Sequence, residues 1–265
     1  MTNTHKTVHT LLIHILLISL FPLKITTSPK TEGYALVKWK NTLIPPLPPS
    51  LSSWSLNNLC TNWYSITCDN TTNTTVSDIN LSGLNLIGTL SQLSFASLPN
   101  LTNLNLSGNN LGGSIPFTIC TLSKLTFLDM DSNLFEGMLP YKLEKLKELQ
   151  YLSLWSNNLN EIGNLKKMRI LFFYQNQLSG FIPMEIENMK EIKELDLSRN
   201  QLCGPIPVEI GKLKEVTMLG LSQNQFFGPI PPEIGNIKKL RQLYLYQNQL
   251  SGLIPVEIGS LKDMV

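Results

Sequence analysis

The side chains best suited to acid–base chemistry in this chain are three aspartates. Asp129 and Asp131 lie two residues apart in a run with alternating apolar residues, and Asp196 holds the place of Asp129 in a later, similar run. On a β-strand, residues i and i+2 face the same side, so two carboxylates at this spacing could share acid–base work. The sequence around them predicts an open surface and not a pocket. We therefore expect solvated charges, or contacts to a basic ligand, more than a catalytic pair.

Histidine, the commonest catalytic base, is confined to the start of the chain, at His5, His9 and His14. There, residues 11–21 (LLIHILLISLF) are apolar but would span only about 16 Å as a helix, against roughly 30 Å for a bilayer core. We therefore predict a secretory signal peptide over residues 1–27. A mature chain without histidine cannot use a Ser–His or Cys–His mechanism and lacks the usual zinc ligand. We expect no catalytic residue, no metal site and no cofactor.

The charge balance argues against nucleic acid as a partner. The chain has 21 Lys and Arg against 19 Asp and Glu, and loss of Lys6 and Lys24 with the signal peptide leaves 19 − 19, or zero. Nucleic-acid binding needs a basic face, and the zero net charge of the mature chain gives no reason to expect one. No later run reaches the roughly 18 apolar residues of a membrane helix, so we expect no membrane span within the mature chain.

A repeat fills most of the remaining sequence. The run LTNLNLSGNNLGGSIP, which begins at Leu101, recurs with substitutions, and a divergent first copy begins at Val76. One asparagine marks each later copy, at spacings of 24, 24, 19, 24, 24 and 24 residues. These asparagines are Asn109, Asn133, Asn157, Asn176, Asn200, Asn224 and Asn248. We predict eight repeats over residues 76–263, of about 24 residues each with the fourth shortened to 19, and the stump of a ninth at residues 264–265.

The repeat pattern predicts how each copy folds. LxxLxL alternates with period two, so each copy should supply a short strand whose leucines point inward. The asparagine that follows should satisfy backbone groups of neighbouring turns as a buried ladder. GxIP should bend the chain across the far side, and EIGxLKxL should carry it back. Stacked copies bury a core that one copy could not, which predicts an α/β solenoid with eight parallel strands on its concave face.

This repeat resembles the plant type of leucine-rich repeat, LxxLxLxxNxLxGxIPxxIGxLxx, and the resemblance implies a right-handed superhelix. Residues 28–75 resemble that family's N-terminal cap, with an amphipathic helix in EGYALVKWKNTL and a tryptophan and cysteine pattern in LSSWS and CTNWYSITCD. The resemblance implies a disulfide between Cys60 and Cys68, which a secreted chain would oxidise, and which would staple a helical lid over the open end of the solenoid. Residues 44–50 (IPPLPPS) are expected to form a loop of this cap, the alternative being a polyproline ligand.

A signal peptide, a cap and repeats in this order resemble the N-terminal ectodomain of a plant leucine-rich repeat receptor-like kinase. The resemblance implies a module that perceives a peptide or other secreted signal, with a secreted peptide or protein ligand and a co-receptor ectodomain as partners. It implies the cell surface or the cell wall as location, and no enzyme activity in this chain, because kinase and membrane helix would lie beyond Val265. We expect that the end at Val265, which lacks a cap, is incomplete. The alternatives are a secreted inhibitor similar to polygalacturonase-inhibiting proteins, which usually end in a cysteine cap, and a truncated copy without function.

Large side chains gather at the variable positions of the expected concave face, through which a solenoid binds. The predicted ligand-binding residues are Phe127, Asp129, Asp131, Tyr151, Trp155, Ile170, Phe172, Tyr174, Tyr244 and Tyr246. Exposed aromatic residues on one face are typical of an interface core, because each buries much area at a low entropy cost. The alternative is that aromatic side chains of adjacent repeats only stack along the solenoid.

Five Asn-x-Ser/Thr sequons lie in the cap and the first two repeats. They are Asn70, Asn73, Asn80, Asn100 and Asn105. Glycosylation is expected at some of them in a secreted chain. Glycans at Asn80 and Asn105 would project from the strand face and direct a ligand toward the third repeat and beyond.

Two further cysteines, Cys120 and Cys203, are expected to be free thiols. They occupy different points of their turns and lie about four repeats apart, roughly 19 Å of stacking, which is too far for a disulfide. The alternative is a bridge to another protein.

The fourth repeat is the irregular one. Its sequence WSNNLNEIGNLKKM joins Asn160 to Glu161 without the intervening GxIPx. We expect a shortened far side with a continuous strand face. We interpret the junction as a deletion relative to a longer receptor, of five residues or of five plus whole repeats.

Overall fold

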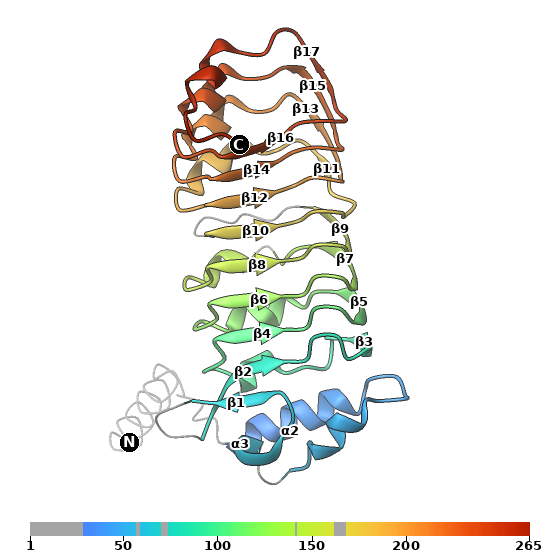
Figure 1. The fold of residues 1–265 in the computed structure, drawn as a ribbon. Helices are drawn as coiled ribbons and strands as arrows, with labels where there is room; N and C mark the ends of the chain where they lie inside the picture. Colours follow the sequence, from blue (N-terminus) through green and yellow to red (C-terminus); the bar gives the residue numbers. More distant parts are fainter. Residues whose placement is uncertain (1–28, 57–58, 70–73, 141, 162–167) are drawn as a thin grey trace, which may run out of the picture.

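The computed structural model describes residues 29–56, 59–69, 74–140, 142–161 and 168–265. Their backbone winds into an elongated solenoid whose turns stack one above the other, with a helical cap at one end (Figure 1). The predicted signal peptide and the sequons Asn70 and Asn73 lie outside the described residues, as does most of the segment that follows Glu161 in the shortened repeat. No described helix is long and apolar enough to cross a bilayer.

One long sheet runs the length of the solenoid. Its nine strands, in spatial order, are β1 (Ile66–Cys68), β2 (Val76–Asn80), β4 (Asn103–Asn105), β6 (Phe127–Asp129), β8 (Tyr151–Ser153), β10 (Ile170–Phe172), β12 (Glu194–Asp196), β14 (Met218–Gly220) and β16 (Gln242–Tyr244). From β2 to β16 every neighbouring pair is parallel, which confirms the eight parallel strands predicted from LxxLxL. The cap adds β1, which is antiparallel to β2 and was not predicted.

The strands pair in a constant register, including across the shortened repeat. Leu128 lies opposite Leu152, and Leu152 lies opposite Leu171 although the intervening repeat has lost residues. Because a shift by one residue would turn every leucine to the other face, this register keeps all the leucines in the core. The strand face is therefore continuous, as expected.

A second series of short strands follows the asparagine of each turn. Its members are β3 (Ile87–Thr89), β5 (Asn110–Ser114), β7 (Leu134–Met138), β9 (Asn158–Glu161), β11 (Ser179–Gly180), β13 (Gln201–Gly204), β15 (Gln225–Pro229) and β17 (Gln249–Ser251). They form two four-stranded sheets, β3-β5-β7-β9 and β11-β13-β15-β17. The sequence had indicated only a bend here. The break between β9 and β11 falls at the shortened repeat, so the loss interrupts this second series and spares the main sheet.

Short 3-10 helices occupy the far side of the repeats, and η1 belongs to the cap. They are η1 (Pro49–Ser53), η2 (Phe95–Ser97), η3 (Phe117–Thr121), η4 (Leu143–Lys145), η5 (Met184–Asn188), η6 (Val208–Lys212), η7 (Pro232–Asn236) and η8 (Val256–Ser260). For η3, η5, η6, η7 and η8 the IP of the repeat explains where the helix starts, because its proline is the residue directly before the helix. Ile206 is buried, while Pro207, with φ −67° and ψ 140°, holds the chain extended directly before η6. In each repeat whose far side is described, the returning segment is therefore a short 3-10 turn.

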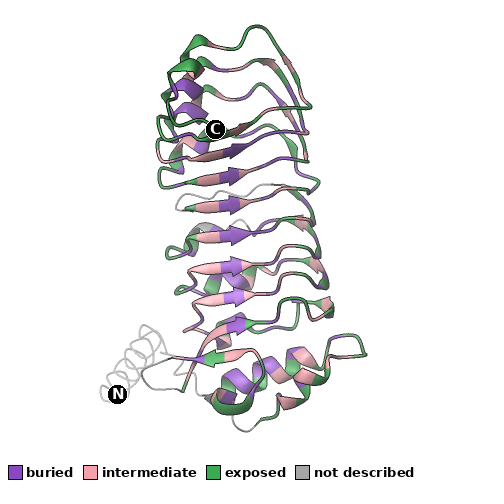
Figure 2. Ribbon diagram, viewed as in Figure 1, coloured by how far each residue is buried: buried purple, intermediate pink, exposed green. Residues whose placement is uncertain are grey.

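The core is a continuous column of leucine, isoleucine and phenylalanine, with a buried residue on each parallel strand from β2 to β14, while Leu243 of the last strand, β16, is only half-buried (Figure 2). The predicted asparagine ladder lines its edge. The Nδ2 of Asn133 donates to the carbonyls of Leu106 (2.9 Å) and Met130 (3.2 Å), while its Oδ1 accepts from the Leu111 amide (3.0 Å). Equivalent hydrogen bonds recur from Asn109 through Asn248. Each amide therefore ties two neighbouring turns together and leaves few buried polar groups unsatisfied.

The cap combines α2 (Pro29–Lys40), α3 (Leu59–Asn62) and strand β1. The predicted disulfide joins Cys60 to Cys68, with a Cα–Cα distance of 5.4 Å. From α2, the Trp39 indole donates to the Thr89 carbonyl at 2.8 Å, and buried Glu32 accepts from the Val76 amide at 2.9 Å. The cap is thus held to the first repeat by apolar packing, by the pairing of β1 with β2, by the backbone hydrogen bond from Ile44 to Ile87 and by these two side-chain hydrogen bonds.

The two remaining cysteines are unpaired. Cys120 is buried and Cys203 is half-buried, and both are free thiols, as predicted from their positions in the repeat. Burial raises the pKa of the Cys120 thiol, which makes it less reactive.

Candidate ligand-binding surface

Three rows of side chains cross the concave sheet, because strands in constant register place equivalent residues side by side. The first row, at the start of each strand, is Asp78, Asn103, Phe127, Tyr151, Ile170, Glu194, Met218 and Gln242. The second row, two residues on, is Asn80, Asn105, Asp129, Ser153, Phe172, Asp196, Gly220 and Tyr244. The third row, two residues further, is Ser82, Ser107, Asp131, Trp155, Tyr174, Ser198, Ser222 and Tyr246.

Five aromatic side chains from repeats three to five form an aromatic cluster across these rows: Phe127, Tyr151, Trp155, Phe172 and Tyr174. Phe127 and Tyr151 stack with ring centroids 4.4 Å apart and planes 10° apart. Phe172 meets Tyr151 edge-on at 6.3 Å, and Trp155 meets Tyr174 edge-on at 5.6 Å. The rings therefore stack along the solenoid, and Trp155 is also exposed to solvent, with 43% of its surface accessible. Mutual contact holds these rings in fixed positions while leaving them open to a partner.

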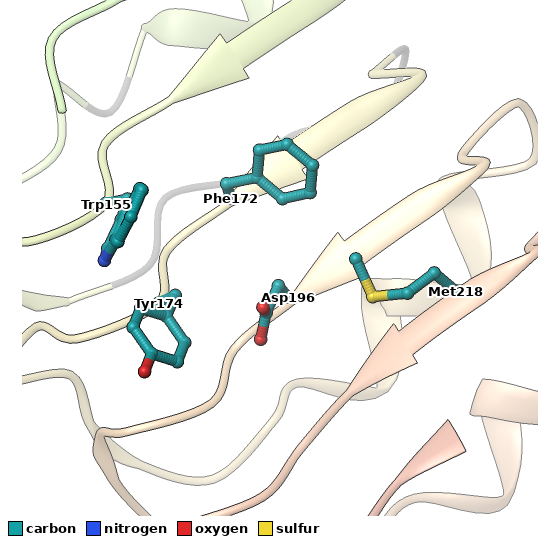
Figure 3. A pocket seen from close by; sticks show the side chains of 5 residues that line it. All are labelled: Trp155, Phe172, Tyr174, Asp196 and Met218. Atoms are coloured by element: carbon teal, nitrogen blue, oxygen red, sulfur yellow. The ribbon is translucent and has the colours of Figure 1, made fainter. Parts of the chain in front are cut away.

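The aromatic cluster borders a hollow of about 310 Å³, lined by Trp155, Phe172, Tyr174, Asp196 and Met218 (Figure 3). Phe172 and Met218 lie on either side of Asp196, whose carboxylate is the one acidic group in a mostly apolar wall. Asp196 is held in place by its own turn, since its Oδ1 accepts from the Ser198 amide at 2.9 Å. Such a site can receive an apolar side chain with a cation or hydrogen-bond donor close by.

Arg199 closes one side of this surface. Its guanidinium lies 5.3 Å from the centroid of the Tyr174 ring, in a cation–π contact. The backbone of Arg199 has φ 54°, close to the values at the equivalent residues Gln175 and Gln223. The left-handed turn after each strand therefore fixes the position of the Arg199 backbone. Arg199 thus packs against an aromatic ring beside the three rows.

The paired aspartates lie outside the hollow. The amide of Asp131 donates to Oδ1 of Asp129 at 3.2 Å. Burial raises the pKa of the Asp129 carboxyl to about 7; a side-chain hydrogen bond and like charge from Asp131 add to this effect, while the hydrogen bond from the Asp131 amide opposes it. The expectation of fully solvated carboxylates therefore does not hold for Asp129, which is half-buried. Burial, and then the charge of Asp129, also raise the pKa of Tyr151.

The structure brings together most of the predicted binding residues but not all of them. Tyr244 and Tyr246 lie at the far end of the second and third rows, separated from the aromatic cluster by Gly220 and Ser222. Ile170 fills the first row between Tyr151 and Glu194 and is half-buried. The predicted set is thus one large surface and one separate tyrosine pair.

Sequence reasoning missed Met218 and Arg199. Met218 sits 24 residues after Glu194 in the first row, so the repeat spacing alone could have placed it beside the aromatic cluster. Among the described residues, no group of three or more His, Cys, Asp or Glu could hold a metal ion.

Three of the sequons can be placed. Asn80 and Asn105 are neighbours in the second row, on the first two parallel strands. Asn80 is exposed, and Asn105 is half-buried with Oδ1 accepting from the Ser107 amide at 3.0 Å. Asn100, at the turn before β4, accepts a hydrogen bond from Lys124 at 2.7 Å.

Comparisons with known proteins agree with this architecture. A family model described as leucine rich repeat N-terminal domain matches residues 29–69, and one described as Leucine Rich Repeat matches residues 100–122, 191–213 and 239–261. MDIS1-interacting receptor like kinase 2 of Arabidopsis thaliana is 36% identical over 109 residues, which are 40% of this chain and 10% of that protein.

Solved structures give the same result over most of the chain. The ectodomain of the Arabidopsis thaliana receptor kinase GASSHO1/SCHENGEN3, in complex with CASPARIAN STRIP INTEGRITY FACTOR 2, is 32% identical with a TM-score of 0.72, over 88% of this chain and 32% of that one. The Arabidopsis receptor kinase HAESA, in complex with the peptide hormone IDA and the co-receptor SERK1, is 31% identical with a TM-score of 0.69, over 88% of this chain and 44% of that one.

These matches confirm the predicted resemblance and fold class. The chain carries a leucine-rich repeat N-terminal domain and leucine-rich repeats, is homologous to plant leucine-rich repeat receptor kinases, and folds like their ectodomains. It spans less than half of these two solved ectodomains, and its match covers about a tenth of the curated relative.

Proposed function

We propose that this leucine-rich repeat chain is an extracellular recognition module, part of the ectodomain of a plant receptor-like kinase that perceives a secreted peptide or similar signal at the cell surface. The observation that carries the proposal is the hollow beside Trp155 and Phe172, set among half-exposed aromatic residues on the concave face. Aromatic anchors around a concave site are typical of binding surfaces.

The relatives support this proposal. HAESA was solved with a peptide hormone and a co-receptor, and its ectodomain shares this fold. We expect the aromatic cluster to receive the ligand and a co-receptor ectodomain to be a second partner. The relatives are receptor kinases, and this chain corresponds to their repeat-containing ectodomains, so we assign it no catalytic step.

Glycans fit the same arrangement. We propose that Asn80 and Asn105 carry sugar, which would cover the concave face of the first two repeats. The uncovered face would then begin at β6, where the aromatic cluster starts. This would direct a ligand to the third repeat and those that follow it.

The test is selection of peptides from a phage-displayed random library on the full chain, secreted from eukaryotic cells. We expect selected peptides to lose binding to the double variant Trp155→Ala, Phe172→Ala, while cooperative unfolding of that variant is retained. A matched control is Phe227→Ala, which removes a half-exposed ring from β15, outside the three rows. Peptides that bind the double variant and the natural chain equally would overturn the proposal.

A further inference from the structure

The charges on the concave face have one sign. The three rows contain five acidic residues and no lysine or arginine: Asp78, Asp129, Asp131, Glu194 and Asp196. The nearby basic side chains flank the rows, and Arg199 among them already contacts Tyr174. None of the five acids forms an ion pair with a described residue. The five carboxyl groups therefore have no ion-pair partner among the described residues, although burial raises the pKa of Asp129 to about 7 and leaves it only partly ionised at neutral pH.

Two of these acids bracket the aromatic cluster along one row. Asp129 and Asp196 both lie in the second row, with Ser153 and Phe172 between them. Three strand spacings separate them, which is roughly 14 Å at about 4.8 Å per strand. Each carboxyl group is fixed by a hydrogen bond from the backbone two residues later, so the two groups are held at a set separation.

An extended peptide laid along the solenoid matches this separation. Its side chains at i, i+2 and i+4 share one face, and i to i+4 spans roughly 13 Å. With residue i at Asp129 and residue i+4 at Asp196, the side chain of residue i+2 falls against Trp155 and Phe172. The hollow there is apolar enough to receive an aromatic or aliphatic group.

We propose that the ligand is a cationic, extended peptide segment in which two basic side chains, four residues apart, pair with Asp129 and Asp196 while an apolar side chain midway between them enters the hollow. This inference rests on the proposed function and specifies its ligand class. Charge complementarity favours the two basic side chains of the ligand, and the aromatic side chains of the hollow favour the apolar side chain midway between them. A second basic group near Asp129 is also favoured by Asp131, which adds a negative charge to the same end.

The experiment uses the full secreted chain and a positional-scanning library of N-acetylated, C-amidated heptapeptides, so that charges come from side chains alone. We expect enrichment of arginine or lysine at two positions four apart, with an aromatic or aliphatic residue midway. A peptide of that pattern should lose affinity about tenfold with Asp196→Asn and about tenfold with Asp129→Asn. Both substitutions preserve the shape of the side chain and the oxygen that accepts from the backbone.

The matched control is Asp78→Asn, an acid of the first row at the first repeat, outside the aromatic cluster, which should change affinity by less than about twofold. Enrichment of uncharged or acidic peptides, or equal effects of Asp196→Asn and Asp78→Asn, would overturn the ligand class. If those peptides still required Trp155 and Phe172, the proposed function would stand while this inference failed. If no peptide required Trp155 and Phe172, both would fail.

Discussion

Asn176 reaches back across the shortened repeat to Leu154. Its Nδ2 lies 2.8 Å from the Leu154 carbonyl oxygen, and its Oδ1 accepts from the Leu159 amide at 3.1 Å. These are the same contacts that the other ladder asparagines make across full repeats. The ladder therefore runs unbroken through the point where the second series of strands is interrupted.

The first prediction concerns this asparagine. Asn176→Ala leaves the Leu159 amide and the Leu154 carbonyl without their partner, and we expect the free energy of unfolding to fall by about 2–4 kcal/mol. Chemical denaturation measures it. Asn158→Ala is the control, because this exposed neighbour makes only a side-chain contact with Gln177, and it should change stability by less than about 0.5 kcal/mol. Equal effects of the two substitutions would show that the ladder does not stabilise the junction.

A second prediction links Gly220 to the orientation of Asp196. A Cβ at residue 220 would lie 2.3 Å from Oδ1 of Asp196 and 2.9 Å from Oγ of Ser198. Gly220→Ala should therefore displace the Asp196 carboxylate and weaken peptide binding about tenfold, at a cost in stability of about 1–2 kcal/mol. Titration calorimetry and denaturation measure the two effects. Gly112→Ala, whose Cβ would meet only ordinary contacts, is the control. Undiminished binding by Gly220→Ala would show that the position of Asp196 does not matter.

A third prediction concerns pH and the cap. Burial raises the pKa of Glu32 from 4.5 to about 7, although the Val76 amide opposes the shift. The folded state therefore holds this proton more tightly than the unfolded state, and the free energy of unfolding should fall by about 3 kcal/mol as pH rises from 4.5 to 7.

Glu32→Gln removes that contribution, so the difference between the natural chain and the variant should depend on pH in this window. Thermal unfolding at a series of pH values measures it. Asp129, whose pKa is also raised to about 7, contributes a pH dependence of the same sign to both proteins and cancels in the comparison. A difference that stays constant from pH 4.5 to 7 would contradict the assignment to Glu32.

The fourth prediction concerns the disulfide. Cys60 and Cys68 are eight residues apart, and closing so short a loop stabilises the folded chain by about 2–3 kcal/mol in the chain-entropy model. Cys60→Ser should lower the stability of the cap and the secreted yield, measured by denaturation and by protein recovered from the medium. Cys203→Ser removes a half-buried free thiol and should leave the yield unchanged. A cap of unchanged stability in Cys60→Ser would show that packing around Trp54 and Trp63 suffices.

The periodic part of the fold could be predicted from the sequence, because each structural role recurs at a fixed position. Leu104 and Asn109 have counterparts in nearly every repeat, so the strands and the ladder follow from spacing. The second series of strands could not be found in this way, since β11 (Ser179–Gly180) is only two residues long and lacks an apolar alternation. The antiparallel pairing of β1 with β2 could not be predicted either, because it depends on how the cap folds back on the first repeat.

The candidate site could be predicted only in part, because repeat spacing locates single residues but not the contacts between strands. Aromatic side chains at variable positions identified Trp155 and Phe172, but the hollow also needs Met218 from two strands further on. The raised pKa of Asp129 depends on burial within the assembled sheet, which a single repeat does not reveal. The burial of Glu32 could not be predicted, because a glutamate on a helix is usually solvated.

The most direct test of ligand recognition by this surface is site-specific photo-crosslinking to a selected peptide. The photoreactive amino acid p-benzoylphenylalanine is placed at residue 218, in the hollow, or at residue 103, in the same row but on the second repeat. We predict a crosslink to the peptide from position 218 that excess unlabelled peptide abolishes, and none from position 103. A crosslink from position 103 alone, or equal crosslinks from both positions, would contradict the account.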